Sequence, residues 1–373
     1  MRRAIVLGGS GLIGRAVARR LLSSGWEVHI TGRALSRVPA DLIALGAAFH
    51  AVERSDSRAL QQLVGSGADL LVDCLCFTAA DARQLLPVLD DVGSSVMLSS
   101  KAVYVDSLGR HVNSPGRPVF SGPIAEDQPT VAPGNGYFDS PEGYGSNKVA
   151  AEQVLLDSGC PVTVLRASKV HGEGASPARE WVFVRRVLDA RKAVFLAASG
   201  SGVDHTTAAV NAAALVEVVA LHPGRRILNS ADPDAPSALE ISRSVAAYFG
   251  HQWEEVLLSG ETESVGSAGR ARSRDSGVGG VGGVDAGAGG VLPSERVQLG
   301  SHPWESAAPI ILDTRASQEL GYVPVGDYAD TVQNELEWLS KSADDPRYAA
   351  DRLEFFNRYV DYAAEDRFMA ERQ

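Results

Sequence analysis

Short apolar segments alternate with stretches of helical spacing along the first half of the chain. Residues 4–7 form an apolar run, and beyond it Ile13, Val17 and Leu21 recur three to four positions apart. This pattern predicts a strand followed by an amphipathic helix. Apolar strands that alternate with helices predict an α/β fold, a Rossmann-type doubly wound parallel sheet covered on both faces. Further strands are expected at residues 26–31, 47–52, 69–75, 95–99 and 162–166.

The second half of the chain is richer in helical spacing. We interpret residues 1–165 as a dinucleotide-binding domain, residues 166–342 as a smaller C-terminal substrate-binding region and residues 343–373 as a helical tail. Helices are expected at residues 144–157, 178–190, 208–221, 237–248, 314–320 and 328–339, with a strand at 226–229 and renewed order at 310–313.

Three segments depart from this alternation. Residues 106–143 are rich in Gly, Pro, Ser and Asn, and a loop of this length is usually functional or disordered. Residues 261–293 contain the densest glycine, which predicts a disordered or mobile linker. Residues 346–372 predict a charged amphipathic helix with Leu353, Phe356 and Val360 on one stripe. Aromatic residues of this tail are interpreted as packing or as the surface of a homodimer: Phe355, Phe356, Tyr359 and Tyr362.

Composition and charge narrow the class of protein. With 45% hydrophobic residues over 373 positions, the chain can bury a real core. Its net charge of −11 gives no basic face for counterion release, so we expect no nucleic-acid partner. No run approaches the roughly 20 apolar residues of a membrane span, so we expect a cytoplasmic protein without membrane contact. Three cysteines suit neither a disulfide framework nor a zinc site, and Cys74 and Cys76 are expected as buried thiols on one side of a strand.

A glycine-rich turn joins the first strand to the first helix. Residues 8–14 read Gly-Gly-Ser-Gly-Leu-Ile-Gly. Glycines in this context let the turn tighten, let backbone approach a pyrophosphate and let the helix pack on the strand, while the helix N-terminus attracts phosphate. The alternative is a tight turn with only a structural role. We predict a dinucleotide site with contacts from Gly8, Ser10, Gly11, Leu12, Ile13 and Gly14.

The end of the second strand bears on which cofactor is bound. A carboxylate there would hydrogen-bond the ribose of NAD, but the chain reads Thr31-Gly-Arg33, with Arg37 close behind. An arginine can make a forked, charge-assisted contact with the 2′-phosphate of NADP. We therefore predict NADP(H) over NAD(H). The alternative is that Arg33 is a solvated loop residue.

A tyrosine and a lysine four residues apart are the candidate acid–base pair. Tyr144 and Lys148 open a predicted helix, and the i, i+4 spacing places them on one face. A neighbouring ammonium is expected to lower the pKa of the phenol, which could then exchange a proton with a carbonyl or alcohol oxygen. Ser100, at the carboxyl end of the fifth strand, is predicted to hold the same oxygen, and Ser99 is interpreted as a structural strand-end residue that satisfies backbone groups.

These motifs together resemble the extended short-chain dehydrogenase/reductases, the NAD-dependent epimerase/dehydratase family. The resemblance rests on the glycine turn, the blocks at residues 99–104, 126–129, 165–172 and 313–322, and the pair Tyr144 and Lys148. It implies that Tyr144 is the general acid/base, that Lys148 is its electrostatic partner and holds the nicotinamide ribose, and that Ser100 is the catalytic hydroxyl. It also implies that Glu53 and Asp56 lie near the adenine.

Departures from the family pattern concern the substrate. Relatives that dehydrate nucleotide sugars carry an Asp-Glu pair after the Ser/Thr, where this chain has Lys101 and Ala102, so elimination is not expected. Lys169 and His171 stand where the family often has an asparagine and a tyrosine. We assign Lys101, Lys169 and His171 to substrate binding, and Lys169 suits an acidic or phosphorylated group. The alternatives are a surface lysine and a packed or solvated histidine.

The function predicted first is an NADP(H)-dependent reductase or dehydrogenase acting on a small or specialised metabolite. The alternative is a sugar or sugar-nucleotide epimerase that oxidises and re-reduces one carbon. A third hypothesis is a non-catalytic cofactor-binding scaffold or sensor, which the intact set Ser100, Tyr144 and Lys148 disfavours. No metal site is predicted.

Overall fold

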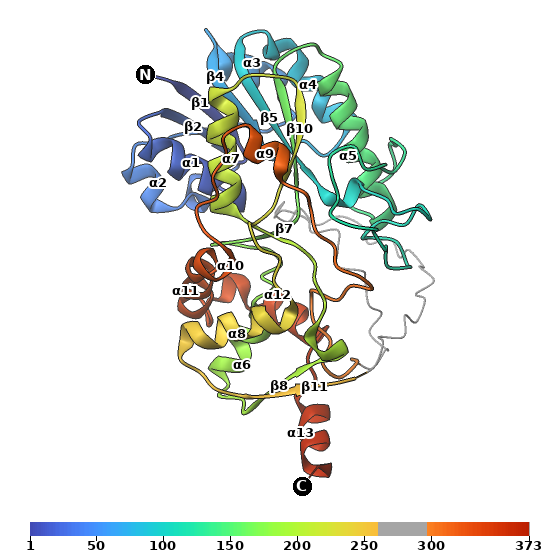
Figure 1. Cartoon of the computed structure of the whole chain (residues 1–373). Coiled ribbons are helices and arrows are strands. Elements are labelled where there is room, and N and C mark those ends of the chain that lie inside the picture. Colours follow the sequence, from blue (N-terminus) through green and yellow to red (C-terminus); the bar gives the residue numbers. More distant parts are fainter. Residues whose placement is uncertain (260–296, 373) are drawn as a thin grey trace.

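The centre of the molecule is a seven-stranded parallel sheet. The computed structural model describes residues 1–259 and 297–372, so the predicted linker at residues 261–293 lies outside the described residues. The strands of the sheet are β1 (Arg3–Leu7), β2 (Glu27–Gly32), β3 (Ala48–Ala51), β4 (Ala68–Asp73), β5 (Val92–Ser100), β6 (Val162–Ala167) and β10 (Arg226–Ser230). Their order is β10-β6-β5-β4-β1-β2-β3, and the chain winds outward from β1 in both directions (Figure 1).

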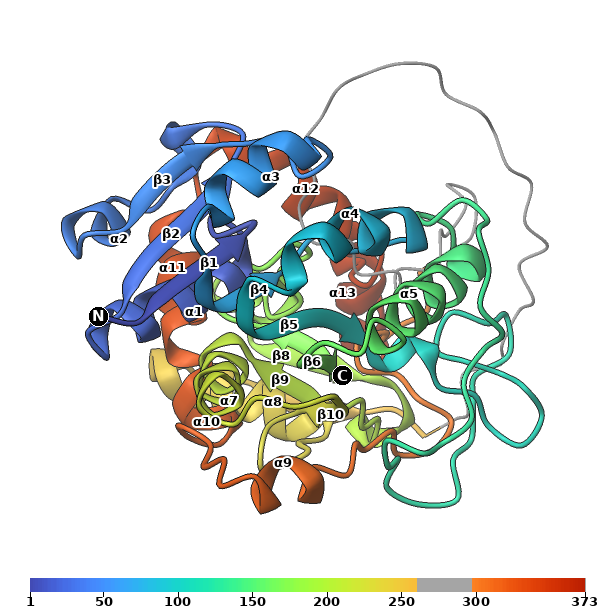
Figure 2. The same cartoon turned by 90° about the horizontal axis from the view of Figure 1, so that it is seen from above.

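Helices cover both faces of this sheet. Alternate side chains of β1 point to opposite sides, so Ala4 and Val6 enter one core while Ile5 and Leu7 enter the other. Figure 2 shows the two helix layers on either side of the strands. One layer is α1 (Leu12–Ser23), α2 (Ala40–Ala44) and α7 (Ala209–Leu221), and the other is α3 (Ser57–Val64), α4 (Ala79–Leu89) and α5 (Pro141–Leu156). The predicted doubly wound α/β fold is confirmed.

A second, smaller unit of structure lies below the sheet in Figure 1. It has a core of its own, in which Trp304 stacks on Phe183 with ring centroids 5.7 Å apart. Two short parallel sheets belong to it, β7 with β9 and β8 with β11. The remaining elements are β7 (Lys169–His171), α6 (Trp181–Leu188), β8 (Ala193–Leu196), β9 (Thr206–Ala208), α8 (Ala238–Phe249), β11 (Glu254–Leu257), α9 (Arg315–Glu319), α10 (Tyr328–Thr331), α11 (Gln333–Lys341), α12 (Pro346–Asn357) and α13 (Tyr362–Glu371), with short 3-10 turns η1 (Leu35–Arg37), η2 (Lys101–Val103) and η3 (Ala197–Gly200).

The chain passes between these two parts more than once. The central sheet takes its edge strand β10 from far beyond residue 165, and α7 packs against α1. The division at residue 165 therefore stays a prediction, although the strand and helix positions on both sides of it agree with the apolar pattern. Among the described residues, no helix is both long and apolar enough to cross a bilayer.

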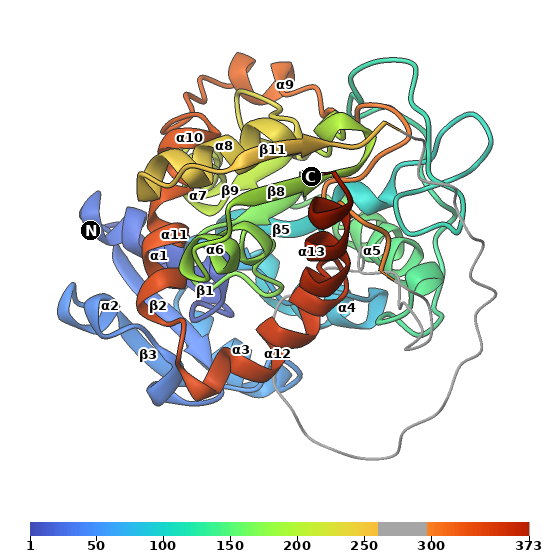
Figure 3. The same cartoon turned by 90° about the horizontal axis from the view of Figure 1, so that it is seen from below.

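The C-terminal tail forms two helices where one was expected. Phe356 and Val360 are buried as predicted, and Phe355 joins them, but Leu353 is 60% exposed, so its place on the buried stripe is wrong. The adjacent pair Phe355 and Phe356 makes the apolar period ambiguous, and the core selects the face that holds both rings. Figure 3 shows α12 and α13 lying beside α6, to which a buried Arg186–Glu365 ion pair ties α13.

Candidate active site

The glycine-rich turn between β1 and α1 has the tight geometry that its sequence predicted. Gly8 has φ +80°, in the region that favours glycine. A Cβ on Gly14 would overlap the carbonyl oxygen of Gly8 and lie 2.9 Å from the Cα of Gly9, so helix and turn could not pack this closely with a side chain there. Gly9 is equally constrained, because its Cβ would lie 2.5 Å from the Cβ of Ile30, a role that the sequence analysis missed.

The N-terminus of α1 faces this turn without a side-chain cap. Gly11 is the N-cap residue and donates its own N–H to Gly8 O at 2.9 Å. The helix begins at Leu12, so the first-turn N–H groups of Leu12, Ile13 and Gly14 are placed to meet an anion. The residues present therefore fit a dinucleotide pyrophosphate, since a side chain would fill the space that the bare glycine backbone leaves.

Beyond β2, two arginines are available for a phosphate. Arg33 and Arg37 are exposed, and within the described part of the chain neither side chain makes a hydrogen bond or an ion pair. The residues expected near the adenine are also exposed. Asp56 caps α3 by accepting the N–H of Ala59 at 3.0 Å, and Glu53 lies in the preceding turn.

A buried ion pair beside the turn was not predicted. Arg54 donates two hydrogen bonds, at 2.9 and 2.7 Å, to the carboxylate of Asp73, which is 1% exposed at the end of β4. Asp73 in turn accepts the N–H of Leu75 at 2.8 Å, which fixes the chain leaving β4 against Gly8. Nothing in the spacing of these residues shows that they meet, because Arg54 lies past β3 and Asp73 at the end of β4.

Ser100, Tyr144 and Lys148 come together at the carboxyl edge of the sheet. Ser100 ends β5, its hydroxyl accepts the N–H of Ala102 at 3.1 Å, and it lies near enough to Tyr144 on α5 to favour the ionised phenol. Lys148 Nζ lies 5.9 Å from the centroid of the Tyr144 ring. A Cβ on Gly145 would lie 2.7 Å from Ala102 O, so a glycine at this point lets α5 approach the turn after β5. The structure thus places the predicted acid–base group in one buried cluster.

The electrostatics of this cluster differ from the expectation. Burial raises the pKa of Tyr144 to about 12, with Ser100 acting in the opposite direction, so the predicted lowering is wrong. Lys148 Nζ donates instead to the carbonyl oxygens of Cys76 and Leu98, each at 2.8 Å. Burial also lowers the pKa of Lys148. The phenol is therefore the resting form of Tyr144.

Ser99 has the structural role that was expected for it, although its partner is a side chain. Its hydroxyl donates to Glu152 of α5 at 2.5 Å, and Arg166 of β6 binds the other Glu152 oxygen at 2.6 Å. All three side chains are buried. This network ties α5 to two strands of the sheet, one turn beyond Lys148.

Two of the predicted substrate residues share one carboxylate. Lys101 and Lys169 contact opposite oxygens of Asp204, the second at 3.2 Å from Lys169 Nζ to Oδ2. The three side chains are 6%, 12% and 8% exposed, respectively. Burial lowers the pKa of both lysines well below the usual value for lysine. Lys169 is therefore not the surface lysine of the alternative interpretation.

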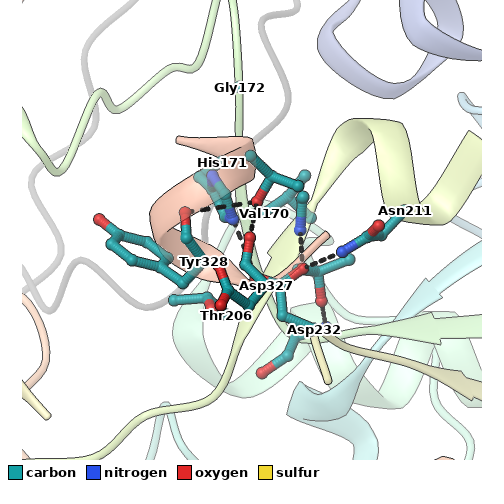
Figure 4. Close-up of polar contacts among 12 residues, drawn as sticks. Val170, His171, Gly172, Thr206, Asn211, Asp232, Asp327 and Tyr328 are labelled. Carbon is teal, nitrogen blue, oxygen red and sulfur yellow. Dashed lines mark hydrogen bonds and ion pairs between the residues drawn. The ribbon is translucent and has the colours of Figure 1, made fainter. Parts of the chain in front are cut away.

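His171 belongs to a neighbouring buried network, drawn in Figure 4. Its Nε2 lies 2.9 Å from Asp232 Oδ2, and Asp232 also accepts from Thr206 Oγ1 at 2.7 Å and Asn211 Nδ2 at 2.8 Å. Burial opposes a charge on the ring, but the Asp232 carboxylate outweighs it and raises the pKa of His171. The ring is 1% exposed and tilted against Tyr328, a packed arrangement, so its substrate role stays a prediction.

The described part of the chain has no cluster of side chains that could hold a metal ion. Across residues 1–259 and 297–372, no three His, Cys, Asp or Glu side chains gather as metal ligands. All three cysteines are free. Cys74 and Cys76 follow β4, which ends at Asp73, so the expected strand geometry is wrong for them. Burial raises the pKa of Cys74 to about 12, so its thiol is protonated at neutral pH.

Comparison with known proteins identifies the family and the fold. Residues 4–203, more than half of the chain, match the model of the NAD dependent epimerase/dehydratase family. No curated protein matches the sequence significantly.

Solved structures with the same fold have low sequence identity. The UDP-glucose 4-epimerase of Thermotoga maritima, solved with UDP-glucose, is 16% identical with a TM-score of 0.62 and covers 92% of this chain and 100% of its own. The dTDP-glucose 4,6-dehydratase of Bacillus anthracis, solved with NAD, is 15% identical with a TM-score of 0.61 and coverages of 92% and 98%. The UDP-glucuronic acid 4-epimerase of Bacillus cereus, solved with UDP-glucuronic acid and NAD, is 16% identical with a TM-score of 0.59 and coverages of 91% and 99%. At these identities the likeness establishes the fold.

The glycine turn gives the first testable expectation. Gly14→Ala places a methyl group against Gly8 O, and we expect cofactor affinity to fall by about tenfold or more, a loss of about 1.4 kcal/mol of binding free energy. Isothermal titration with NADPH and NADH measures it. Gly122→Ala is the matched control, since its Cβ would meet nothing within 4 Å. Equal affinities for the two variants would contradict the assignment of this turn to the dinucleotide.

Proposed function

The chain belongs to the NAD-dependent epimerase/dehydratase family, an enzyme family of the extended short-chain dehydrogenase/reductase type, and on this basis we propose that Ser100, Tyr144 and Lys148 catalyse hydride transfer at a carbinol or carbonyl carbon. The observation that carries the proposal is the gathering of the three side chains: Ser100 at the end of β5, Tyr144 in the first turns of α5, and Lys148 Nζ 5.9 Å from the Tyr144 ring. This group lies at the carboxyl edge of the sheet, on the same edge as the glycine turn. Ligands bind at this edge in open α/β sheets.

Each residue of the group has a distinct task in the proposal. The bound nicotinamide supplies or accepts the hydride. Tyr144, a phenol at rest, donates its proton to a carbonyl oxygen on reduction and takes a proton from the hydroxyl on oxidation. Ser100 positions that oxygen by hydrogen bonding. Lys148 keeps a positive charge near the phenol, anchored by the carbonyl oxygens of Cys76 and Leu98.

For the cofactor, we propose NADP(H) over NAD(H), on the strength of Arg33. Its exposed guanidinium follows β2 directly, and Arg37 lies one short turn further on. Either arginine could meet a 2′-phosphate. The structural neighbours solved with NAD make NAD(H) an equally good fit to the fold, so the preference depends on these two side chains alone.

For the substrate, we propose a sugar nucleotide, with epimerisation as the net reaction. The structural neighbours solved with UDP-glucose and with UDP-glucuronic acid support this class. The residues Lys101 and Ala102, in place of the acidic pair of the dehydratases, argue against elimination. Epimerisation was the alternative in the sequence analysis, and the comparisons favour it over net reduction.

Net reduction of a small metabolite stays the second candidate. Arg33 favours NADP(H), and NADPH is a diffusible reductant that a reductase consumes. The two candidates give different spectra. An epimerase retains its nicotinamide through turnover without net consumption, whereas a reductase consumes NADPH in proportion to product.

The catalytic assignment is tested by Tyr144→Phe. We expect this variant to bind the cofactor with unchanged affinity and to lose hydride transfer by about a hundredfold or more, within the range that general acid–base catalysis contributes. Nicotinamide absorbance in single-turnover mixing with UDP-glucose or UDP-glucuronic acid measures the rate. Tyr137→Phe, at an exposed tyrosine, is the control. Unchanged turnover in Tyr144→Phe would refute the mechanism.

The cofactor preference is tested by Arg33→Ala. Loss of a charge-assisted contact to a 2′-phosphate should weaken NADPH binding by about tenfold or more while leaving NADH binding unaltered. Isothermal titration of NADPH and of NADH into the unchanged protein and into the variant gives the change in affinity for each cofactor. Arg83→Ala removes an exposed arginine of α4 and serves as the control. If the Arg33 variant weakens both cofactors equally, the NADP(H) assignment fails.

A further inference from the structure

We propose that Lys101 and Lys169 bind a carboxylate of the substrate, next to the carbon that is oxidised or reduced. The proposal rests on the proposed function, because it takes Ser100 and Tyr144 to mark the reacting carbon. It adds a substrate class, a sugar nucleotide whose sugar bears a carboxylate.

The register of the sheet places the two lysines beside each other. β5 and β6 run parallel, and Ser100 is aligned with Ala167 at their carboxyl ends. Lys101 directly follows Ser100, and Lys169 lies two residues after Ala167. Both lysines therefore emerge at the edge of the sheet where ligands of such folds bind.

A third strand brings the acidic partner to this edge. β9 pairs with β7, with Lys169 aligned to Thr206, and Asp204 lies two residues before Thr206. Its two carboxylate oxygens are divided between Lys101 and Lys169. The carboxylate thus holds both ammonium groups in place from the side of the smaller unit.

The charges in this cluster do not balance. Two ammonium groups share one carboxylate, and all three side chains are almost completely removed from water. A buried charge is costly unless it is fully paired. A second carboxylate, supplied by the substrate, would complete the pairing with a charge-assisted hydrogen bond to each lysine.

Burial first, and then neighbouring cations, disfavour the charged form of each lysine and lower its pKa. Burial is the main cause that lowers the pKa of Lys101, and repulsion by Lys169 and Arg179 lowers it further. For Lys169, burial and Arg179 lower the pKa, while Glu180 acts in the opposite direction. An added anion would relieve this repulsion.

The position of the pair beside Ser100 indicates which end of the substrate carries the anion. Ser100 ends β5 near Tyr144 of α5, and Lys101 is the next residue along the chain. A carboxylate on the reacting sugar would therefore lie close to the lysines, while the hydroxyl that is oxidised lies at Tyr144. A neutral sugar would leave the cluster with its charge excess.

Matched pairs of ligands test the proposal on the full chain loaded with cofactor. Isothermal titration compares UDP-glucuronic acid with UDP-glucose, and D-glucuronate with D-glucose, since the members of each pair differ by one carboxylate. We expect the acid to bind about tenfold or more tightly than the neutral ligand in at least one pair. Lys101→Met and Lys169→Met should each remove most of this preference, and Lys192→Met, at an exposed lysine, should keep it.

A further variant separates ligand binding from a structural role. Asp204→Asn removes the competing carboxylate, so the preference for the acid should increase, whereas a cluster that only supports the fold would give weaker binding of both ligands.

Two results would overturn the proposal. The first is no preference for the acid in either pair, whether both ligands bind equally or neither binds. The second is tighter binding of D-glucose 6-phosphate than of D-glucuronate, which would assign the lysines to a phosphate. Equal binding of both members of a pair, or tighter binding of the phosphate, leaves hydride transfer to be decided separately by the Tyr144→Phe experiment, whereas no binding of any of these ligands would also contradict the sugar-nucleotide substrate.

Discussion

The geometry of the site depends on a buried ion pair that fixes helix α5 against the sheet. Glu152 of α5 binds Arg166 of β6 at 2.6 Å and accepts the hydroxyl of Ser99 on β5 at 2.5 Å. Tyr144, Lys148 and Glu152 recur every fourth residue on α5, so all three lie along the buried side of the helix. Loss of either charge would leave the other buried without a partner, which is strongly destabilising. The network therefore holds Tyr144 in register with Ser100.

A second constraint joins the sheet to the smaller unit. The carboxylate of Asp232, which follows β10, accepts hydrogen bonds from His171 of β7, Thr206 of β9 and Asn211 of α7 (Figure 4). These partners come from the strands and the helix that carry the chain between the two parts. β7 and β9 are also the elements that bring Lys169 and Asp204 to the edge of the sheet. The packing around Asp232 thus positions the cationic pair relative to Ser100.

Local patterns predicted the fold and the meeting of the proposed catalytic residues, because apolar runs, glycine spacing and the interval from Tyr144 to Lys148 can be read from residues close together in the sequence. Contacts between segments that are distant in the chain could not be predicted from the sequence. Burial of Tyr144 depends on the packing of the whole fold, and it raises the pKa that the nearby lysine was expected to lower; Lys148 itself is held by the carbonyl oxygens of Cys76 and Leu98. The meeting of Lys101 with Asp204 likewise depends on strand pairing across more than a hundred residues.

The central claim is that Tyr144 exchanges the proton of the reacting oxygen, and it is tested most directly by the pH dependence of one oxidative turnover. The protein, loaded with oxidised cofactor, is mixed with a nucleotide sugar, and the growth of reduced nicotinamide is followed by absorbance. Because burial raises the pKa of Tyr144, the phenol predominates at neutral pH, and the rate should rise with pH as the phenolate becomes available. A rate that is independent of pH, or reduction that proceeds equally fast with phenylalanine at position 144, would contradict the account.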